Sequence, residues 1–252
     1  MILDRVTITG ADDSIRTDDL EKISLDFPFV EWGILASKSN RGGAPRFPSP
    51  RWFTDLQGIA EMTGDLQLSL HLCGRWVRDL LVGNVTFPES HLHCFRRVQL
   101  NFHAENTPCV PGKFGACLRE IGKEFIFQID NSGGNEHMTA ALEQAVAQSY
   151  PLFDLSGGAG VVPKEWPKPF SMDGDDFCCH GYAGGLGPDN LEHEIGRIAA
   201  VVGDCRIWID METRVRSEDD RQFDLEKVRR CLEIAAPFVS VTARATRNGD
   251  GR

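Results

Sequence analysis

The regular alternation of strand-length apolar runs with helix-like segments constrains this chain more than any other feature. Eight runs have the pattern of buried strands, at residues 5–10, 29–36, 66–72, 96–102, 124–130, 151–155, 177–183 and 205–211. Helical periodicity separates them, at about residues 17–26, 50–63, 88–95, 112–121, 136–148, 188–202 and 223–236. Thr17, Asn135 and Asp224 are typical N-cap residues for three of these helices. Such alternation predicts a parallel sheet whose strands are joined by helices.

The number of strand–helix units predicts how the sheet closes. Eight units in 252 residues match a closed barrel of parallel strands, which uses about this length as one domain. An open doubly wound sheet fits the same alternation, but the count of eight strands disfavours it. We therefore predict the α/β class and a single-domain (β/α)8 TIM barrel over residues 1–240. The polar tail over 241–252 is expected to be disordered.

The charge of the chain limits its partners. The chain has 27 basic and 37 acidic residues and a net charge of −10, which argues against a general nucleic-acid or anionic-membrane surface. No stretch approaches the ~18 apolar residues of a membrane span, and the N-terminus lacks the features of a secretion signal. Its eight cysteines have no disulfide-framework spacing, so most are expected to be free thiols. We expect a cytoplasmic protein with a small-molecule partner, and a homodimer is compatible with the sequence.

A paired-glycine segment, YAGGLGPDNL at 182–191, reads as the end of a strand, a turn and the start of a helix. Gly184 and Gly185 allow the backbone to come close to a ligand, and Pro188 fits the first turn of the next helix. The free amides and the positive end of that helix would attract an anion. The turn is therefore predicted to hold an anion such as phosphate. The alternative is a glycine turn that only connects the two elements.

Polar side chains gather at the carboxyl ends of the predicted strands, where the active sites of such barrels lie. Barrel interiors are mainly filled by branched apolar side chains, so these polar groups need either each other or a ligand. A satisfied structural hydrogen bond is the alternative for each uncharged residue. The set suits a polyhydroxylated substrate and comprises Thr9, His71, Asn101, His103, Gln128, Asp130, Asp154, Asp210 and Glu212.

The order of several motifs resembles that of the phosphoribosylanthranilate isomerases of tryptophan biosynthesis. Their first strand, their serine-x-arginine segment and the start of their fourth strand are similar to VTITG at 6–10, FPSPRW at 47–52 and VQL at 98–100. Their sixth strand with its glycine loop and aromatic residue resembles LFD at 152–154, GGAG at 157–160 and Trp166. Their seventh-strand phosphate loop and eighth strand with its helix resemble AGGLGPDN at 183–190, Ile209-Asp210 and FDLEKV at 223–228.

The resemblance implies an Amadori rearrangement, in which a phosphorylated aminoaldose opens and becomes an aminoketose. A general acid protonates the ring oxygen, and a general base removes the proton from the neighbouring carbon. The resemblance places the acid at Asp154 and a carboxylate-binding arginine at Arg51, for which a solvent-facing arginine is the alternative. It also implies a phosphate cradle made by Gly157, Gly158, Gly184 and Gly185.

Two positions depart from the pattern of that family. Thr9 stands where the family has its catalytic cysteine, and a hydroxyl is a far poorer base than a thiolate at neutral pH. The family's serine-serine-glycine phosphate turn is replaced by DMETR at 210–214. Within it Glu212 would repel a phosphate, whereas Arg214 could bind one directly. The tryptophan-pathway reaction itself is therefore not the predicted activity.

We predict an isomerase-like enzyme that acts on a small phosphorylated or carboxylated sugar derivative. Asp154 would act as the acid, and the base would be Asp210, Glu212 or His71. One alternative is a non-catalytic barrel that binds a metabolite. Another is a metal-dependent sugar-phosphate epimerase-like enzyme using His71, Asp130, Asp154 and Asp210, but its other ligands do not line up.

The segment Cys178-Cys179-His180 is an incomplete zinc pattern, because neighbouring side chains of a strand point to opposite faces. We predict neither a metal nor a cofactor.

Overall fold

The structure is a computed structural model, which describes residues 1–40, 42, 45–102, 108–130, 149–155, 159–170 and 179–240. Several sequence-based predictions fall outside these residues: His103 after the fourth strand, the helix over 136–148 with its cap Asn135, the glycines Gly157 and Gly158, the thiol of Cys178, and the tail over 241–252.

Eight parallel strands form a closed barrel in sequence order, with β8 pairing back to β1. The strands are β1 (Ile2–Thr9), β2 (Val30–Ser37), β3 (Leu68–Cys73), β4 (Arg97–Asn101), β5 (Glu124–Ile129), β6 (Ser149–Asp154), β7 (His180–Ala183) and β8 (Arg206–Met211). Each strand overlaps its predicted run. The predicted α/β class and single-domain (β/α)8 barrel are therefore confirmed.

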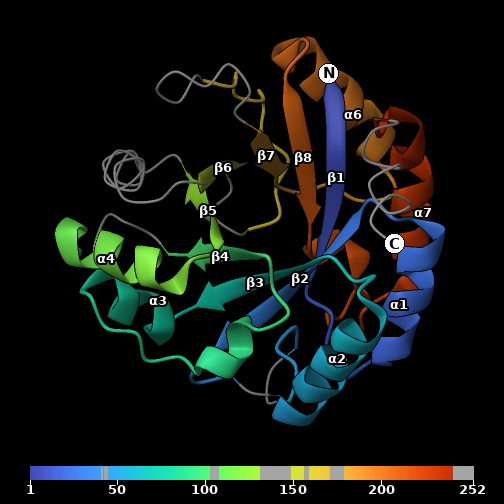
Figure 1. Ribbon diagram of the computed structural model, residues 1–252. Coiled ribbons are helices and arrows are strands. Elements are labelled where there is room, and N and C mark those ends of the chain that lie inside the picture. Colours follow the sequence, from blue (N-terminus) through green and yellow to red (C-terminus); the bar gives the residue numbers. More distant parts are fainter. Residues whose placement is uncertain are drawn as a thin grey trace, which may run out of the picture.

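Helices cover the outside of the barrel, so the strands form the inner ring (Figure 1). The described helices are α1 (Thr17–Asp26), α2 (Pro50–Thr63), α3 (Arg75–Leu81), α4 (Pro111–Ile121), α6 (Leu191–Val202) and α7 (Leu225–Ala235). Short 3-10 turns are η1 (Glu89–Leu92), η3 (Thr213–Val215) and η4 (Ala236–Phe238). Helix α1 packs against α2, α3 against α4, and α6 against α7, so sequential helices are neighbours around the ring.

The helix predicted over 88–95 is wrong. Only the 3-10 turn η1 lies there, and the helix that follows β3 is α3. Gly74, with a φ of +65°, turns the chain directly from the strand into α3. Helix α3 spans only seven residues, of which Trp76, Val77, Leu80 and Leu81 are buried. Such a short, mostly apolar segment has too few polar positions to reveal a helical period.

Two predicted helix starts also change. Thr17 is the first residue of α1 and not its cap, and the residue at the cap position, Arg16, makes no capping bond. Pro188 lies in a turn before α6, which begins only at Leu191. The cap at Asp224 is confirmed, because its carboxylate accepts hydrogen bonds from the first amides of α7.

A buried ion pair occupies the barrel interior near the starts of β2 and β4. Glu31 and Arg97 are only 1% and 2% exposed. Arg97 Nε donates to Glu31 Oε2 at 2.8 Å, Arg5 Nη1 approaches the same oxygen at 3.3 Å, and Thr7 donates to Oε1 at 3.0 Å. The Arg97 guanidinium also lies 4.7 Å from the ring centre of Trp208. Burial opposes ionisation of Glu31, but the two arginines outweigh it and lower its pKa to about 2.

Candidate functional site

A cavity of about 180 Å³ opens at the carboxyl ends of the strands. The fold brings many of the predicted site residues to it: His71, Asn101, Gln128, Asp154, Gly184, Gly185, Asp210, Glu212 and Arg214. Gln99 on β4 and Thr213 after β8 also line it. Parallel strands place their carboxyl ends on one rim, which is why residues so far apart in the sequence meet here. Because these polar groups face a common cavity, the arrangement favours a ligand site.

Three of the predicted site residues, Thr9, Arg51 and Asp130, do not line the cavity. Thr9 is buried beside the cavity, where its hydroxyl donates to Asp210 Oδ1 at 2.8 Å. Arg51 does not reach the cavity: its side chain is 93% exposed, and its nearest ion pair is Asp55, at 4.0 Å. Helix α2 buries Trp52, Phe53 and other apolar residues against the barrel, so position 51 faces solvent. The expectation that Arg51 binds substrate is therefore replaced by its alternative, a solvent-facing arginine.

Asp210 is the carboxyl group that the barrel perturbs most at this rim. It is 7% exposed, and its burial raises the pKa to about 8. The hydrogen bond from Thr9 opposes this shift, whereas the negative charge of Glu212 adds to it. At neutral pH Asp210 therefore carries a proton, which the carboxyl group of an exposed aspartate would have lost.

Asp154 lies on the same rim as Asp210, at the end of β6. In the strand register both residues pair with Ala183 of β7, one from each side. At ~4.8 Å per strand spacing, their Cα atoms lie roughly 10 Å apart. Asp154 is 6% exposed, and Gln128 Nε2 is 3.5 Å from its Oδ2. Two buried carboxyl groups thus flank one small residue at the edge of the cavity.

His71 contributes a neutral ring to the floor of the cavity. It is 1% exposed, and its Nε2 lies 2.9 Å from the hydroxyl of Ser69. Burial lowers the pKa of the ring to about 3, so it is uncharged at neutral pH. Gly33 makes room for it, because a Cβ there would lie 2.8 Å from the ring. His71 is therefore a weak base that can still hydrogen bond to a ligand.

The paired glycines form a tight turn at the rim. Gly184 and Gly185 have φ angles of +123° and +61°, which residues other than glycine rarely adopt. A Cβ on Gly185 would also lie 2.6 Å from the backbone nitrogen of Val162. Asn190 fixes the turn, since its Nδ2 donates to Gly185 O and its Oδ1 accepts from Gly187 N, both at 2.9 Å. Packing against the preceding loop thus explains part of the need for glycine.

The same turn leaves groups free for an anion. Within the described residues, the amides of Gly185 and Leu186 donate no hydrogen bond. Arg214 lines the cavity next to Gly187, is exposed, and forms no ion pair with any residue that the structure describes. Two amides and one unpaired guanidinium therefore border one side of the cavity, which is the combination that binds phosphate or carboxylate groups.

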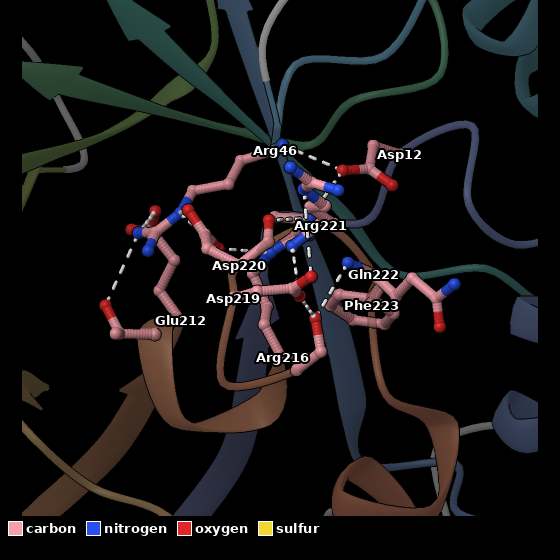
Figure 2. Close-up of polar contacts among 12 residues, drawn as sticks. Asp12, Arg46, Glu212, Arg216, Asp219, Asp220, Arg221, Gln222 and Phe223 are labelled. Carbon is pink, nitrogen blue, oxygen red and sulfur yellow. Dashed lines mark hydrogen bonds and ion pairs between the residues drawn. The ribbon is translucent and has the colours of Figure 1, made fainter.

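A network of charged residues lies at the carboxyl ends of β1, β2 and β8 and comprises Asp12, Arg46, Glu212, Arg216 and Asp220 (Figure 2). We call it the mouth network. Arg46 Nη1 donates to Glu212 Oε1 at 2.6 Å, and its Nε lies 2.9 Å from Asp220 Oδ2. Arg216 binds Asp220 and Asp12, each at 2.7 Å. The network ties the loop after β2 to the loop after β8.

The mouth network changes the interpretation of Glu212. Because Arg46 pairs with its carboxylate, the repulsion that Glu212 would exert on a bound phosphate is partly neutralised. Arg46 itself has a φ of +75°, and Asp220 one of +59°, both unusual for residues with a side chain. Sequence reasoning missed Arg46 and Arg216, since no motif marks either of them.

Other features of the described residues bear on the alternatives. No three His, Cys, Asp or Glu side chains in the described part of the chain lie together so that they could hold a metal ion. The seven cysteines that the structure describes are free. Among the described helices, none has both the length and the apolar character needed to cross a membrane.

Comparisons with known proteins support the fold. No protein-family model matches the sequence, and neither does any curated protein. A solved structure of monomers of the dimeric phosphoribosylanthranilate isomerase from Thermotoga maritima is similar, with a TM-score of 0.52 and 15% identity over 94% of this chain and 100% of that one. A structure of the tryptophan synthase α2β2 complex from Pyrococcus furiosus has a TM-score of 0.51 and 12% identity, over 92% and 100% of the two chains. At this identity the likeness establishes the barrel fold that the two proteins share with this chain.

Proposed function

We propose that this protein is an acid–base isomerase that acts on a small phosphorylated or carboxylated sugar derivative. The observation that carries the proposal is the placement of Asp154 and Asp210 on either side of Ala183, at one cavity. Isomerisation of a sugar needs one group that gives a proton and another that takes one. The similar protein from Thermotoga maritima is also named as an isomerase.

The environments of the two carboxyl groups assign their roles. Asp210 holds a proton at neutral pH, because burial raises its pKa to about 8, so it is the proton donor. After the transfer, the hydroxyl of Thr9 stabilises the new carboxylate. Asp154 then accepts the proton from the carbon next to the carbonyl. This assignment reverses the roles that the family resemblance implies.

The remaining polar residues fit this reaction as supporting groups. His71, with a pKa of about 3, is too weak a base to remove a proton from carbon. Glu212 is held by Arg46 at 2.6 Å and supports the mouth instead. The amides of Gly185 and Leu186, together with Arg214, would bind the anionic group of the substrate.

Proton exchange with solvent tests the proposal without knowledge of the product. Ribose 5-phosphate, glucose 6-phosphate and an N-substituted ribosylamine 5-phosphate are incubated with the protein in D2O, and loss of the C2 proton is followed by NMR. We expect exchange with at least one of them. Asp154→Asn and Asp210→Asn should each slow it by about 10²- to 10⁴-fold while inorganic phosphate still binds.

Three outcomes of this experiment differ in meaning. If the wild-type protein binds the sugar phosphates but exchanges no proton, the isomerase proposal is rejected in favour of a metabolite-binding barrel. If exchange occurs and survives both substitutions, the acid and base are misassigned. If only one variant loses activity, the other carboxyl group has no part in proton transfer.

A further inference from the structure

Gln99, on β4, has a buried side-chain oxygen without a partner. The residue lines the cavity and is 3% exposed, and its Oε1 has no hydrogen-bond partner within the described part of the chain. Buried polar atoms are nearly always paired, and leaving one unpaired costs about 1–3 kcal/mol. Protein atoms cover this oxygen, so a ligand in the cavity can supply the missing donor once a rotation of the Gln99 side chain turns the oxygen toward it.

The neighbours of Gln99 fix which end of its amide is free. Cys73 donates its thiol hydrogen to His71 O at 3.6 Å, so its sulfur acts as acceptor for Asn101 Nδ2 at 3.4 Å. The amide of Asn101 then presents Oδ1 to Gln99 Nε2, at 2.9 Å. Because the nitrogen of the Gln99 amide donates to Asn101, its oxygen is the atom without a partner in the described part of the protein.

The floor around Gln99 offers hydrogen bonds and no positive charge. His71, the register partner of Gln99 on β3, is a neutral ring because burial lowers its pKa to about 3. The oxygen of Gln99 can only accept a hydrogen bond. A carboxylate or phosphate placed against it would bring two acceptors together without a donor, which makes this end of the cavity unfavourable for an anion.

The anion-binding groups lie on the other side of the barrel. Gly185, Leu186 and Arg214 follow β7 and β8, and in the closed strand order β8 lies opposite β4. The cavity between them has a volume of about 180 Å³. Because the two sides differ in chemistry, a ligand that touches both needs two different ends.

We propose that Gln99 is a specificity-determining residue, whose Oε1 accepts a hydrogen bond from a hydroxyl or amino group at the end of the ligand opposite its anion. The ligand class is thus a polyol or amino-polyol with a single anionic end. Compounds whose far end is a carboxylate or an alkyl group are rejected. This inference rests on the proposed function for the anion subsite and adds the chemistry of the far end.

Two phosphate esters of equal chain length test the inference. Ribitol 5-phosphate, n-pentyl phosphate and inorganic phosphate are titrated into the full chain by calorimetry. Wild-type protein should bind ribitol 5-phosphate about tenfold more tightly than pentyl phosphate, the effect of one hydrogen bond. Gln99→Met, which has no acceptor, should reduce this ratio to about one and leave inorganic phosphate binding unchanged.

A second variant separates hydrogen bonding from a change in packing. Gln99→Glu keeps the shape of the side chain, and as a buried, protonated acid it can donate to Asn101 while its carbonyl oxygen still accepts. We expect it to retain most of the preference for ribitol 5-phosphate. Gln99→Met removes the acceptor oxygen and Gln99→Glu keeps one, so only Gln99→Met should lose the preference for ribitol 5-phosphate.

The result that overturns the inference is specific. Pentyl phosphate binding as tightly as ribitol 5-phosphate to the wild-type protein contradicts it, even if neither variant folds. An undiminished preference in Gln99→Met also contradicts it. If none of the three phosphates binds, the anion subsite of the proposed function is wrong, and this inference falls with it.

Discussion

Two buried carboxyl groups inside the barrel, Glu31 and Asp210, are held in opposite ways. They are 1% and 7% exposed, so both are removed from water. The pKa of Glu31 is lowered to about 2, whereas that of Asp210 is raised to about 8. Glu31 faces Arg97 and Arg5, which overcome the effect of burial. Asp210 has a hydroxyl for its hydrogen-bond partner and the negative charge of Glu212 nearby.

The difference separates the interior near the strand starts, where buried charges are paired, from the interior near the strand ends, which lines the cavity. Near the strand starts, each buried charge has a partner of opposite sign, which is typical of a structural ion pair. At the strand ends, burial of Asp210 is not compensated by a cation in contact with it. Groups with strongly shifted pKa values in a cavity are typical of functional sites.

Removing Arg97 should cause the largest loss in unfolding free energy. Arg97→Met leaves Glu31 buried with Arg5, at 3.3 Å, as its remaining guanidinium contact among the described residues. Breaking one side of a buried ion pair costs about 3–5 kcal/mol, and Arg5 should keep the loss in unfolding free energy near ~3 kcal/mol. Urea denaturation monitored by circular dichroism measures it.

The double variant Glu31→Gln with Arg97→Met is the matched control for that experiment. It removes both charges, so the loss should be smaller than in the single variant. A double variant that is as unstable as Arg97→Met would show that lost packing against Trp208, and not an unpaired carboxylate, causes the effect.

Asp210→Asn should change stability in the opposite direction. Below pH ~4 the carboxyl group is protonated in both the folded and the unfolded chain. Between pH ~4 and the folded pKa of about 8, the unfolded chain loses the proton that the folded chain keeps, so wild-type stability falls as pH rises. The variant lacks this penalty, so its advantage over wild type should grow by about 1.4 kcal/mol for each pH unit between ~4 and ~8, from almost nothing at pH 4.

Denaturation midpoints at pH 4, 6 and 8 measure this prediction, and Glu31→Gln provides the contrast. Because the folded pKa of Glu31 is lowered, the stability it contributes is present above pH ~4.5 and is lost as pH falls towards about 2. Both variants should therefore differ from wild type at pH 6 and 8, but in opposite directions: Glu31→Gln should be less stable and Asp210→Asn more stable. Equal pH profiles for Asp210→Asn and wild type would mean that Asp210 ionises normally.

The barrel and much of its rim can be predicted from the sequence, because both follow from local patterns. Each strand run lies within a few residues of its observed place, and the carboxyl end of a parallel strand always reaches the same rim. His71, Asp154 and Asp210 could therefore be assigned to one cavity before any coordinates were known.

The features that decide the chemistry depend on contacts between distant positions. The opposite states of Glu31 and Asp210 follow from which side chains face them across the barrel, 66 residues away in the case of Arg97. The free oxygen of Gln99 follows from a chain of bonds through Asn101 and Cys73. Arg51 is the opposite case, because a sequence motif predicted it at the site, whereas helix α2 directs its side chain to solvent.

The smallest predicted effect concerns the mouth network, where charges are paired as for Glu31 but partly exposed. Arg46→Met keeps a side chain at the same backbone conformation and removes the contacts to Glu212 and Asp220. Because its side chain is 21% exposed, water screens these pairs, and the loss in unfolding free energy should be only about 1 kcal/mol. The freed charge of Glu212 should also weaken inorganic phosphate binding about threefold, since the carboxylate lines the cavity. Adding Glu212→Gln should restore that affinity but not the stability, whereas a defect in phosphate binding that persists in the double variant would mean that Arg46 itself contacts the anion.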